Sequence, residues 1–257
     1  MGLPDTSVTL TVAGCGDAFG TAGSFNTCFI IDDPEGRFAL DFGASSMVAL
    51  NVIGIDPGSI DLVILSHLHG DHFGGLPNLL LHREYVCPNK RPLTILGPPG
   101  TGRKLRQLHD RLYQGLWKCP WNFGLKIIEI EPDKQTILGG RAVLTQVVNH
   151  GLGPEPATAI RVNTHGKIIA FSGDCTWSNT LLEISAGSDI FLCECNDLRD
   201  QNYDGHLSYE TIMRHSDQIK TKRLLLTHLG PEMTAARRNP KSNLRVELLS
   251  DGMEIQL

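Results

Sequence analysis

Four short apolar runs in this chain each end in residues that can bind a metal ion. The first run, Leu62–Leu65, leads directly into Ser66–His72, which has the pattern H-x-H-x-D-H. Short runs of Val, Ile and Leu that stop at polar residues are typical of buried β-strands. Many such strands with few helices between them favour packed sheets with outer helices. This pattern constrains the fold more than any other feature of the sequence.

The histidine-rich stretch itself predicts metal binding. His67 and His69 are two residues apart, so both imidazoles can point the same way and share one ion. Asp71 and His72 project differently and can serve a second ion nearby. Imidazole and carboxylate ligands together suit Zn²⁺ or a related first-row ion. The alternative is a solvated histidine-rich loop, although this pattern arises by chance in only about one chain in a thousand.

Two metal ions need more ligands than one loop can supply, and the other three strand ends offer them. His150 follows Val143–Val148, Asp174 follows Ile168–Phe171, and His228 ends Leu224–His228. A single histidine at a strand end is usually a surface residue. Because the same arrangement occurs at three further strand ends, the sequence predicts that these side chains meet the first motif.

The remaining pattern predicts one domain over residues 1–257. The chain has no internal repeat, no low-complexity segment and no charge block that would mark a linker. We expect strands at Val8–Ala13, Cys28–Ile31, Phe38–Asp41, Asp61–Ser66, Ile127–Ile130, Val143–Val148, Ala159–Val162, Lys167–Ser172, Ile190–Cys193 and Arg223–Leu226, and helices at Thr101–Leu116, Asn179–Ala186 and Ser208–His215.

Composition limits the function. The 23 Lys and Arg against 28 Asp and Glu give a net charge of −5, which disfavours broad nucleic-acid binding because phosphate contacts need clustered cations. No apolar run reaches 18 residues, so a membrane span is not expected. No secretory signal is visible, and the seven cysteines are odd in number and scattered. These features predict reduced thiols and a cytoplasmic location.

The order H-x-H-x-D-H, then His, Asp and His, resembles the metallo-β-lactamase superfamily of hydrolases. The resemblance covers nearly the whole chain from Val8 onward. It implies the α+β class, with a four-layer αβ/βα sandwich that holds two Zn²⁺ ions at one edge between two sheets; Mn²⁺ or Fe are alternatives. It further implies that one ion is held by His67, His69 and His150, that the other is held by Asp71, His72 and His228, and that Asp174 bridges them.

Two further segments are similar to the ribonuclease Z branch of that superfamily. Gly205–Ser208 matches a His-x-Ser/Thr motif, which implies that His206 contacts the scissile phosphate or protonates the leaving oxygen. The apolar run before Glu194 matches the strand whose carboxylate could orient that histidine. The alternative for His206 is a neighbour of a helix N-cap at Ser208. The first loop, Gly14–Gly20, either brings N–H groups close to an anion or forms a tight turn.

The chain also departs from ribonuclease Z. His150 and Asp174 are only 24 residues apart, which leaves no room for the arm that grips transfer RNA in that branch. Phe25 stands where those enzymes usually have Arg before Asn26. We therefore expect a small anionic ester or phosphodiester substrate, and we do not expect extended RNA binding. The sequence leaves the oligomeric state open, although members of the superfamily are commonly homodimers.

The function predicted from these residues is that of a binuclear zinc phosphodiesterase acting by a metal-bound hydroxide. Asp71 would accept the proton of the water as well as bind metal, and His206 would assist the leaving group. The alternative is a hydrolase of another ester, an aryl sulfate or a lactone, on the same metals. Transfer-RNA 3′ processing and a non-catalytic binding role are less favoured, because the arm is missing and all seven ligand positions are present.

Other notable residues receive structural predictions. Cys175, next to Asp174, is expected near the metals without binding one. Cys193 and Cys195 are expected on one side of a buried strand. The aromatic cluster of Trp117, Trp121 and Phe123 either lines a substrate pocket or fills the interior, and the sequence leaves both alternatives open. The histidines without a strand-end position are expected at the surface or on helix faces: His82, His109, His165 and His215.

Overall fold

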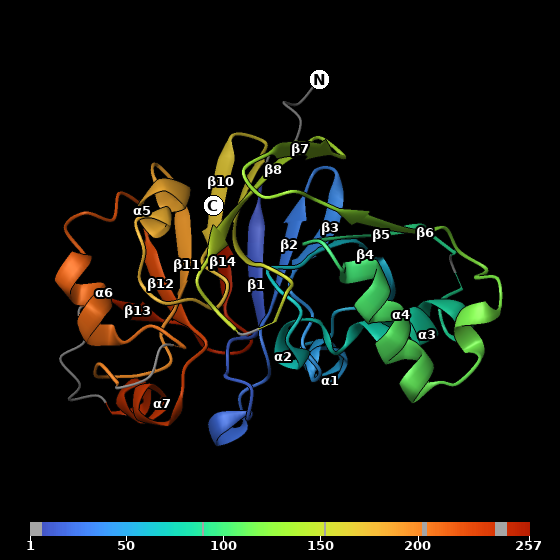
Figure 1. Ribbon diagram of the computed structural model, residues 1–257, viewed down its shortest axis with the longest axis horizontal. Coiled ribbons are helices and arrows are strands. Elements are labelled where there is room, and N and C mark those ends of the chain that lie inside the picture. The colour runs from blue at the N-terminus through green and yellow to red at the C-terminus, as the bar shows by residue number, and fades with distance from the viewer. Residues whose placement is uncertain (1–6, 89, 152, 202–204, 240–245) are drawn as a thin grey trace.

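The strands of this chain form two sheets, as the apolar runs predict. In the computed structural model, residues 7–88, 90–151, 153–201, 205–239 and 246–257 are described, and within them each sheet has seven strands (Figure 1). The first sheet has the order β14 (Glu254–Gln256), β1 (Thr9–Gly14), β2 (Cys28–Asp33), β3 (Gly36–Leu40), β4 (Ile60–Ile64), β5 (Leu93–Gly97), β6 (Leu125–Glu129). The second has the order β13 (Glu247–Leu248), β12 (Leu224–Thr227), β11 (Ile190–Glu194), β10 (Lys167–Phe171), β9 (Ala157–Thr164), β8 (Arg141–Val148), β7 (Gln135–Leu138).

Helices cover the outer faces of both sheets. Figure 1 shows the first four helices beside the first sheet and the later ones beside the second. The layers are therefore helix, sheet, sheet and helix, which confirms the predicted αβ/βα sandwich. In the described parts of the chain, no helix has the length and apolar character to cross a membrane. The helices are α1 (Ser46–Val52), α2 (Gly70–Phe73), α3 (Leu76–Tyr85), α4 (Thr101–Leu112), α5 (Thr180–Ser185), α6 (Tyr209–His215) and α7 (Pro231–Arg238).

Alternating side chains on each strand supply the three apolar layers. On β2, Phe29 and Ile31 pack in the core between the sheets, whereas Ile30 packs toward the helices of the first sheet. On β10, Phe171 packs between the sheets and Ala170 packs toward the helices of the second. Successive side chains of a strand point to opposite faces, so a strand that is apolar on both faces must be covered on both.

The two sheets share one order of strand directions. In the first, β1 to β3 are antiparallel, and β3 to β6 are parallel. In the second, β7 to β10 are antiparallel, and β10 to β13 are parallel. The carboxyl ends of parallel strands lie at the same edge of a sheet, where ligand sites are usually built. The loops after β3, β4, β10, β11 and β12 therefore have the position that a site requires.

Several elements differ from the predicted ones. The predicted helix Thr101–Leu116 ends at Leu112, because Gly115 has a left-handed φ of 85° and the chain turns there. Strands β5, β7, β13 and β14 and helices α1, α2, α3 and α7 were not predicted. Strands of two to four residues, such as β13, β14 and β7, are too short to show a period of two.

His109 lies on a face of helix α4, as one of the two predicted alternatives has it, but that face is buried. His109 is fully buried, and its ring centroid lies 5.4 Å from those of Trp117 and Trp121. Phe123 packs against Trp121 with centroids 5.6 Å apart, and all three aromatic residues contact the core on the helix side of the first sheet. Helix α4 therefore places His109 inside an aromatic cluster that packs against the core, while Trp117 also lines a hollow beside α4.

A buried ion pair ties the two sheets together at the edge opposite to those loops. Arg141, at the start of β8, donates from Nε and Nη2 to the carboxylate of Asp33, at the end of β2, over 2.7 and 2.6 Å. Thr164 of β9 donates to the same carboxylate over 2.6 Å. Burial alone would raise the pKa of Asp33, but the hydrogen bonds from Arg141 and Thr164 outweigh it and lower that pKa.

Replacement of Arg141 by Met is expected to lower the free energy of unfolding by about 3–5 kcal/mol, because it leaves the Asp33 carboxylate buried without a counter-ion. Urea unfolding at pH 7 measures this. The matched control is Arg223→Met, which removes an exposed pair with Glu247 and should cost at most about 1 kcal/mol.

The pH dependence checks the same pair. Since the pKa of Asp33 is depressed in the folded protein, its stabilisation is present above the ordinary Asp pKa of about 3.9 and disappears as the pH falls through the folded value. The difference between wild type and Arg141→Met should therefore shrink in acid. A difference that stays constant down to the acid transition would contradict this account.

Candidate metal centre

The structure brings the predicted metal ligands together between the carboxyl edges of the two sheets. The loop after β4 and the short helix α2 carry four of them, and loops after strands of the second sheet carry the others. Each side chain is therefore placed by the end of a buried strand. The residues gathered in this way are His67, His69, Asp71, His72, His150, Asp174 and His228.

The ligand atoms form two groups that meet at one carboxylate. Those of His67, His69 and His150 lie within 4.8 Å of one another. Asp71, His72, Asp174 and His228 form a second group with the same spacing. The Asp174 Oδ2 atom lies 3.1 Å from Nε2 of His72 and 3.8 Å from Nε2 of His67 and of His150, so this carboxylate stands between the two groups.

Several histidines use Nδ1 for a hydrogen bond within the protein and direct Nε2 toward the centre. Nδ1 of His67 lies 3.0 Å from Ser66 Oγ, and Nδ1 of His150 lies 2.8 Å from the carbonyl oxygen of Gly205. Metal-binding histidines are typically oriented in this way, because the partner of one ring nitrogen fixes the tautomer and the ring plane. The Nε2 atoms of both rings face the other candidate ligands, and Nε2 of His150 lies 3.1 Å from Nδ1 of His69.

Among the described residues, three buried polar atoms at the centre make no hydrogen bond of good geometry, namely Nε2 of His67, Nε2 of His72 and Oδ1 of Asp174. An unsatisfied buried polar group is costly, and a cation would satisfy all three atoms. Burial also holds the pKa of His67 well below its usual range, so this imidazole is neutral, as metal ligation requires. The donor set therefore fits the divalent ions that the resemblance implies.

Asp41 supports the centre and was not predicted as a site residue. Its Oδ2 atom lies 2.6 Å from Nδ1 of His72, and its Oδ1 atom accepts a hydrogen bond of 2.7 Å from the Ser66 backbone N–H. Asp41 comes directly after β3, so the strand-end pattern that identified Asp174 could also have identified it. Its carboxylate orients the imidazole of His72 and fixes the first residue of the histidine loop.

The backbone is strained at two of these positions. Asp41 and His228 have φ values of 57° and 55°, in the left-handed region that residues with a Cβ atom rarely adopt. Such conformations cluster at functional sites, where the surrounding structure holds them. Gly43 is needed nearby for a different reason, because a Cβ atom there would lie 2.1 Å from the carbonyl oxygen of Asp71.

His206 and Glu194 form a hydrogen-bonded pair beside the two ligand groups. Nδ1 of His206 lies 3.0 Å from Oε1 of the fully buried Glu194. The other oxygen of Glu194 accepts a hydrogen bond of 3.1 Å from the Leu207 backbone N–H. Burial alone would lower the pKa of His206, but the hydrogen bond and charge of Glu194 outweigh it and raise that pKa to about 9. The N-cap of α6 is Ser208, which accepts from the Thr211 N–H, so the His206 side chain is not needed for capping.

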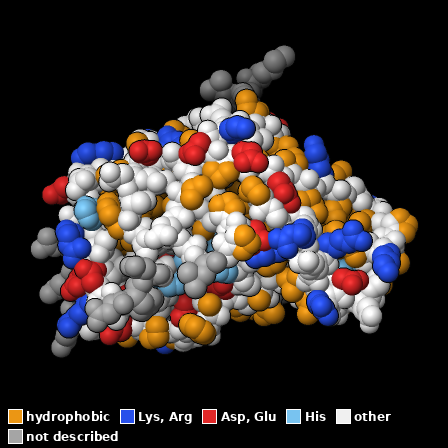
Figure 2. Space-filling view, viewed as in Figure 1, with side chains coloured by type: hydrophobic (Ala, Val, Ile, Leu, Met, Phe, Trp, Pro, Cys, Tyr) orange, Lys and Arg blue, Asp and Glu red, His pale blue; other side chains and the backbone are white. Residues whose placement is uncertain are grey.

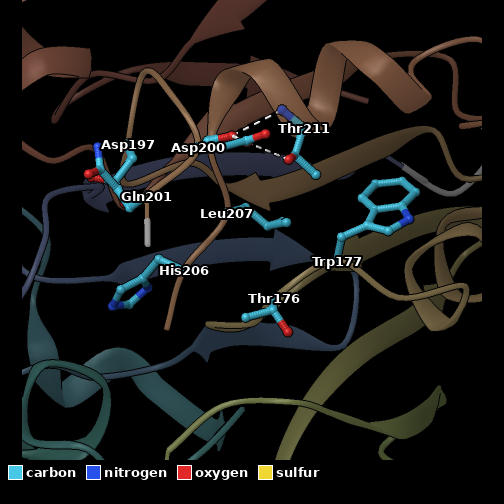
Figure 3. Close-up of a pocket in the computed structure, with 9 residues that line it drawn as sticks. Thr176, Trp177, Asp197, Asp200, Gln201, His206, Leu207 and Thr211 are labelled. Carbon is cyan, nitrogen blue, oxygen red and sulfur yellow. Dashed lines mark hydrogen bonds between the residues drawn. The ribbon is translucent and has the colours of Figure 1, made fainter. Parts of the chain in front are cut away.

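A hollow of about 300 Å³ opens beside His206. Figure 3 shows the imidazole at one side of it, with Thr176 and the indole of Trp177 across from Asp197. Trp177 is fixed by stacking on His215, with ring centroids 4.1 Å apart. This hollow has room for a small organic group next to the two ligand groups.

The remaining predictions near the site concern Cys175 and the first loop. Cys175 is buried, its N–H donates to Glu194, and burial and the Glu194 charge raise the pKa of its thiol well above the usual value. A protonated thiol of this kind is a poor ligand. In the first loop, the N–H of Gly16 donates to Phe25 and the N–H of Cys15 donates to Asp251. These two N–H groups are therefore bound to other segments of the protein.

Replacement of Asp41 by Asn is expected to lower the affinity for the metal ions by about 10- to 100-fold, as loss of an outer hydrogen-bond partner usually does. Asn tolerates the left-handed φ at this position, so the backbone is preserved. Its NH₂ group, however, cannot accept the hydrogen bonds that one carboxylate oxygen of Asp41 accepts now. Competition with a chromogenic chelator measures the affinity. An affinity equal to that of the wild type, with the fold intact by circular dichroism, would show that Asp41 does not support the ligands.

Comparison with known proteins identifies relatives of the chain. A family model described as "Anti-Pycsar protein Apyc1" matches residues 8–250. An uncharacterised protein of Mycobacterium leprae (strain TN) is 30% identical over 232 residues, which cover 88% of this chain and 78% of that protein.

Two solved structures share the fold. The metallo-β-lactamase fold protein YhfI from Bacillus subtilis superposes with a TM-score of 0.78 and 20% identity, covering 98% of this chain and 100% of that one. The short form of human tRNase Z gives a TM-score of 0.75 and 21% identity, covering 96% and 98%. The predicted metallo-β-lactamase fold is therefore confirmed, and a ribonuclease Z stands among the proteins that share it.

Proposed function

The chain belongs to the family described as anti-Pycsar protein Apyc1, and we propose that it is a metal-dependent hydrolase, specifically a binuclear zinc phosphodiesterase for a small anionic substrate. The observation that carries the proposal is the pair of ligand groups that meet at Asp174. Their five histidines and two carboxylates suit Zn²⁺, with Mn²⁺ or Fe as alternatives. Bound there, two ions would bring the pKa of a water molecule close to 7 and offset the negative charge of a phosphate.

Asp71 is the residue proposed to take the proton from the attacking water. Its Oδ2 atom lies 3.2 Å from Nε2 of His72 and 4.0 Å from Nε2 of His228. The carboxylate is thus directed into the second ligand group, where it can bind an ion and face the water at the same time. Interaction with His72 and His228 outweighs burial and lowers the pKa of Asp71, so the carboxylate is ionised before it accepts the proton.

His206 is proposed to protonate the leaving oxygen. Glu194 holds its Nδ1 atom, which leaves the Nε2–H for the substrate, and the raised pKa keeps the imidazole protonated at neutral pH. A general acid must be protonated before the reaction and within hydrogen-bond reach of the leaving group. The hollow beside His206 would hold that group.

The segment between the candidate ligands His150 and Asp174 supports a small substrate. The described residues between His150 and Asp174 include the antiparallel strands β9 and β10 of the second sheet, so little of this segment is left for an RNA-gripping arm. The net charge of −5 also disfavours a broad phosphate-binding surface. A phosphodiester near the size of the hollow therefore suits this protein better than transfer RNA.

The variant His206→Ala is expected to lower kcat on a phosphodiester with an alkoxide leaving group by a factor of about 10²–10⁴, the usual contribution of a general acid. Its metal content, measured by mass spectrometry, should stay near that of the wild type. Glu194→Gln should lower kcat less, since the imidazole remains. Loss of metal in His206→Ala would instead make His206 a ligand or a structural residue.

Removal of the metal by dialysis against a chelator is expected to abolish hydrolysis, and two equivalents of Zn²⁺ per chain should restore it. A panel of a phosphodiester, an aryl sulfate and a lactone then tests the reaction class. The proposal fails if the restored protein favours the sulfate or the lactone, or if it is equally active without metal.

A further inference from the structure

Lys104 lies beside the first ligand group, although it has no part in the proton transfers proposed for Asp71 and His206. A narrow hollow on the open side of that group is lined by His67, His69, His150 and Lys104. Among the described residues that line this hollow, Lys104 is the sole Lys or Arg. Figure 2 shows Lys and Arg side chains gathered over the region of α4, near the histidine side chains that reach the surface. A cation therefore faces the place where an anionic substrate would approach the metals.

The start of α4 holds Lys104 in a fixed position. The carboxylate of Glu129, at the end of β6, accepts hydrogen bonds of 3.0 and 2.9 Å from the backbone N–H groups of Gly100 and Gly102. Thr101 and Leu105 are fully buried on either side. The backbone of Lys104 is thus anchored to the first sheet, and its side chain alone has to move to meet a ligand.

Glu155 forms an ion pair with Lys104 in this structure. The Glu155 Oε2 atom lies 2.8 Å from Nζ of Lys104, and its other oxygen is paired with Arg103. The Glu155 side chain is 7% exposed and lines the same hollow. Gly100 leaves space for it, because a Cβ atom there would lie 2.7 Å from Cγ of Glu155. Glu155 therefore lies at the wall of the hollow and neutralises the cation that faces it.

Arg103 and Lys104, the two cations paired with Glu155, differ in a way that allows a substrate anion to replace Glu155 at Lys104. The Arg103 side chain is 57% exposed and does not line the hollow, whereas Lys104 is at its wall. If an anion takes Lys104, Arg103 still pairs with Glu155, so the carboxylate is not left unpaired in a largely buried place. Lys is also a compact charge on a flexible stem that can turn from one oxygen to another.

We propose that Lys104 binds an anionic oxygen of the substrate phosphate, and that Glu155 is the counter-ion which the substrate displaces. The inference rests on the proposed function, since it takes the ligand to be a phosphodiester monoanion at the two ligand groups. It adds a specificity determinant: substrates with a negative oxygen on the side of α4 bind more tightly than uncharged esters of the same size.

The first experiment uses Lys104→Met in the metal-loaded protein. The Kd of inorganic phosphate, measured by calorimetry, and the KM of bis-p-nitrophenyl phosphate should both rise by roughly 10- to 100-fold, as expected for loss of a charge-assisted hydrogen bond. The kcat and the metal content should change by less than about twofold. Lys104→Arg should restore part of the affinity. The matched control Lys118→Met removes an exposed lysine beyond the end of α4 and should change neither constant.

The second experiment uses Glu155→Gln, with Glu131→Gln as the control at an exposed position. Since the substitution frees Lys104, the affinity for inorganic phosphate should rise several-fold. Weaker or unchanged phosphate binding in Glu155→Gln would overturn the role of the counter-ion. Loss of metal from Lys104→Met, or unchanged phosphate affinity in it, would overturn the role of Lys104.

The outcomes separate this inference from the proposed function. Phosphate binding that depends on Lys104, in a protein that hydrolyses no phosphodiester, would support the anion site and contradict the phosphodiesterase proposal. If the protein hydrolyses a phosphodiester but its affinity for phosphate is unchanged in Lys104→Met, the phosphodiesterase proposal is supported and this inference is contradicted.

Discussion

The central strands of both sheets are apolar on two faces, and the rest of the structure depends on the need to cover both. Phe29 and Ile31 of β2 need the second sheet, while Ile30 needs the helices. With both faces covered, ligand atoms can be presented only at the sheet edges and in the loops. Each sheet contributes the carboxyl ends of its parallel half to one edge. Strand β8, which precedes His150, runs in the same direction as β10, so the loops that carry histidine and aspartate converge there without any long insertion.

The candidate metal centre combines rigid support with buried atoms that could bind a cation. The Nδ1 atoms of His72, His67 and His150 lie at hydrogen-bond distance from Asp41, Ser66 and Gly205, respectively. The Nε2 atoms of these rings are therefore directed at the centre. The left-handed backbone at His228 persists because β12 is paired on both sides and holds it in place. Carboxylates also pair with residues farther from the centre: Glu194 orients His206, and Glu155 pairs with Lys104.

The sequence predicted those elements in which one physical signal dominates. The interior strands, from β1 to β4 and from β8 to β12, show apolar runs long enough to identify. Edge strands such as β13 and β14 are two or three residues long and exist only because a longer neighbour pairs with them. The burial of His109 was not predicted, because its surroundings come from Trp117 and Trp121, which are brought against it by a turn whose path the helical pattern did not show.

The sequence by itself determined the kind of fold, the strand-end positions of the candidate ligands and the resemblance to metal-dependent hydrolases, because these follow from local alternation and from the spacing of His67, His69 and Asp71. Only the tertiary structure decided which strand ends meet. Asp41 and Asp174 have similar local sequence settings, yet one supports a histidine and the other stands between the two ligand groups. Likewise Lys104 and Glu155 lie 51 residues apart, and their pairing depends on the packing of α4 against the loop after β8, which no local pattern encodes.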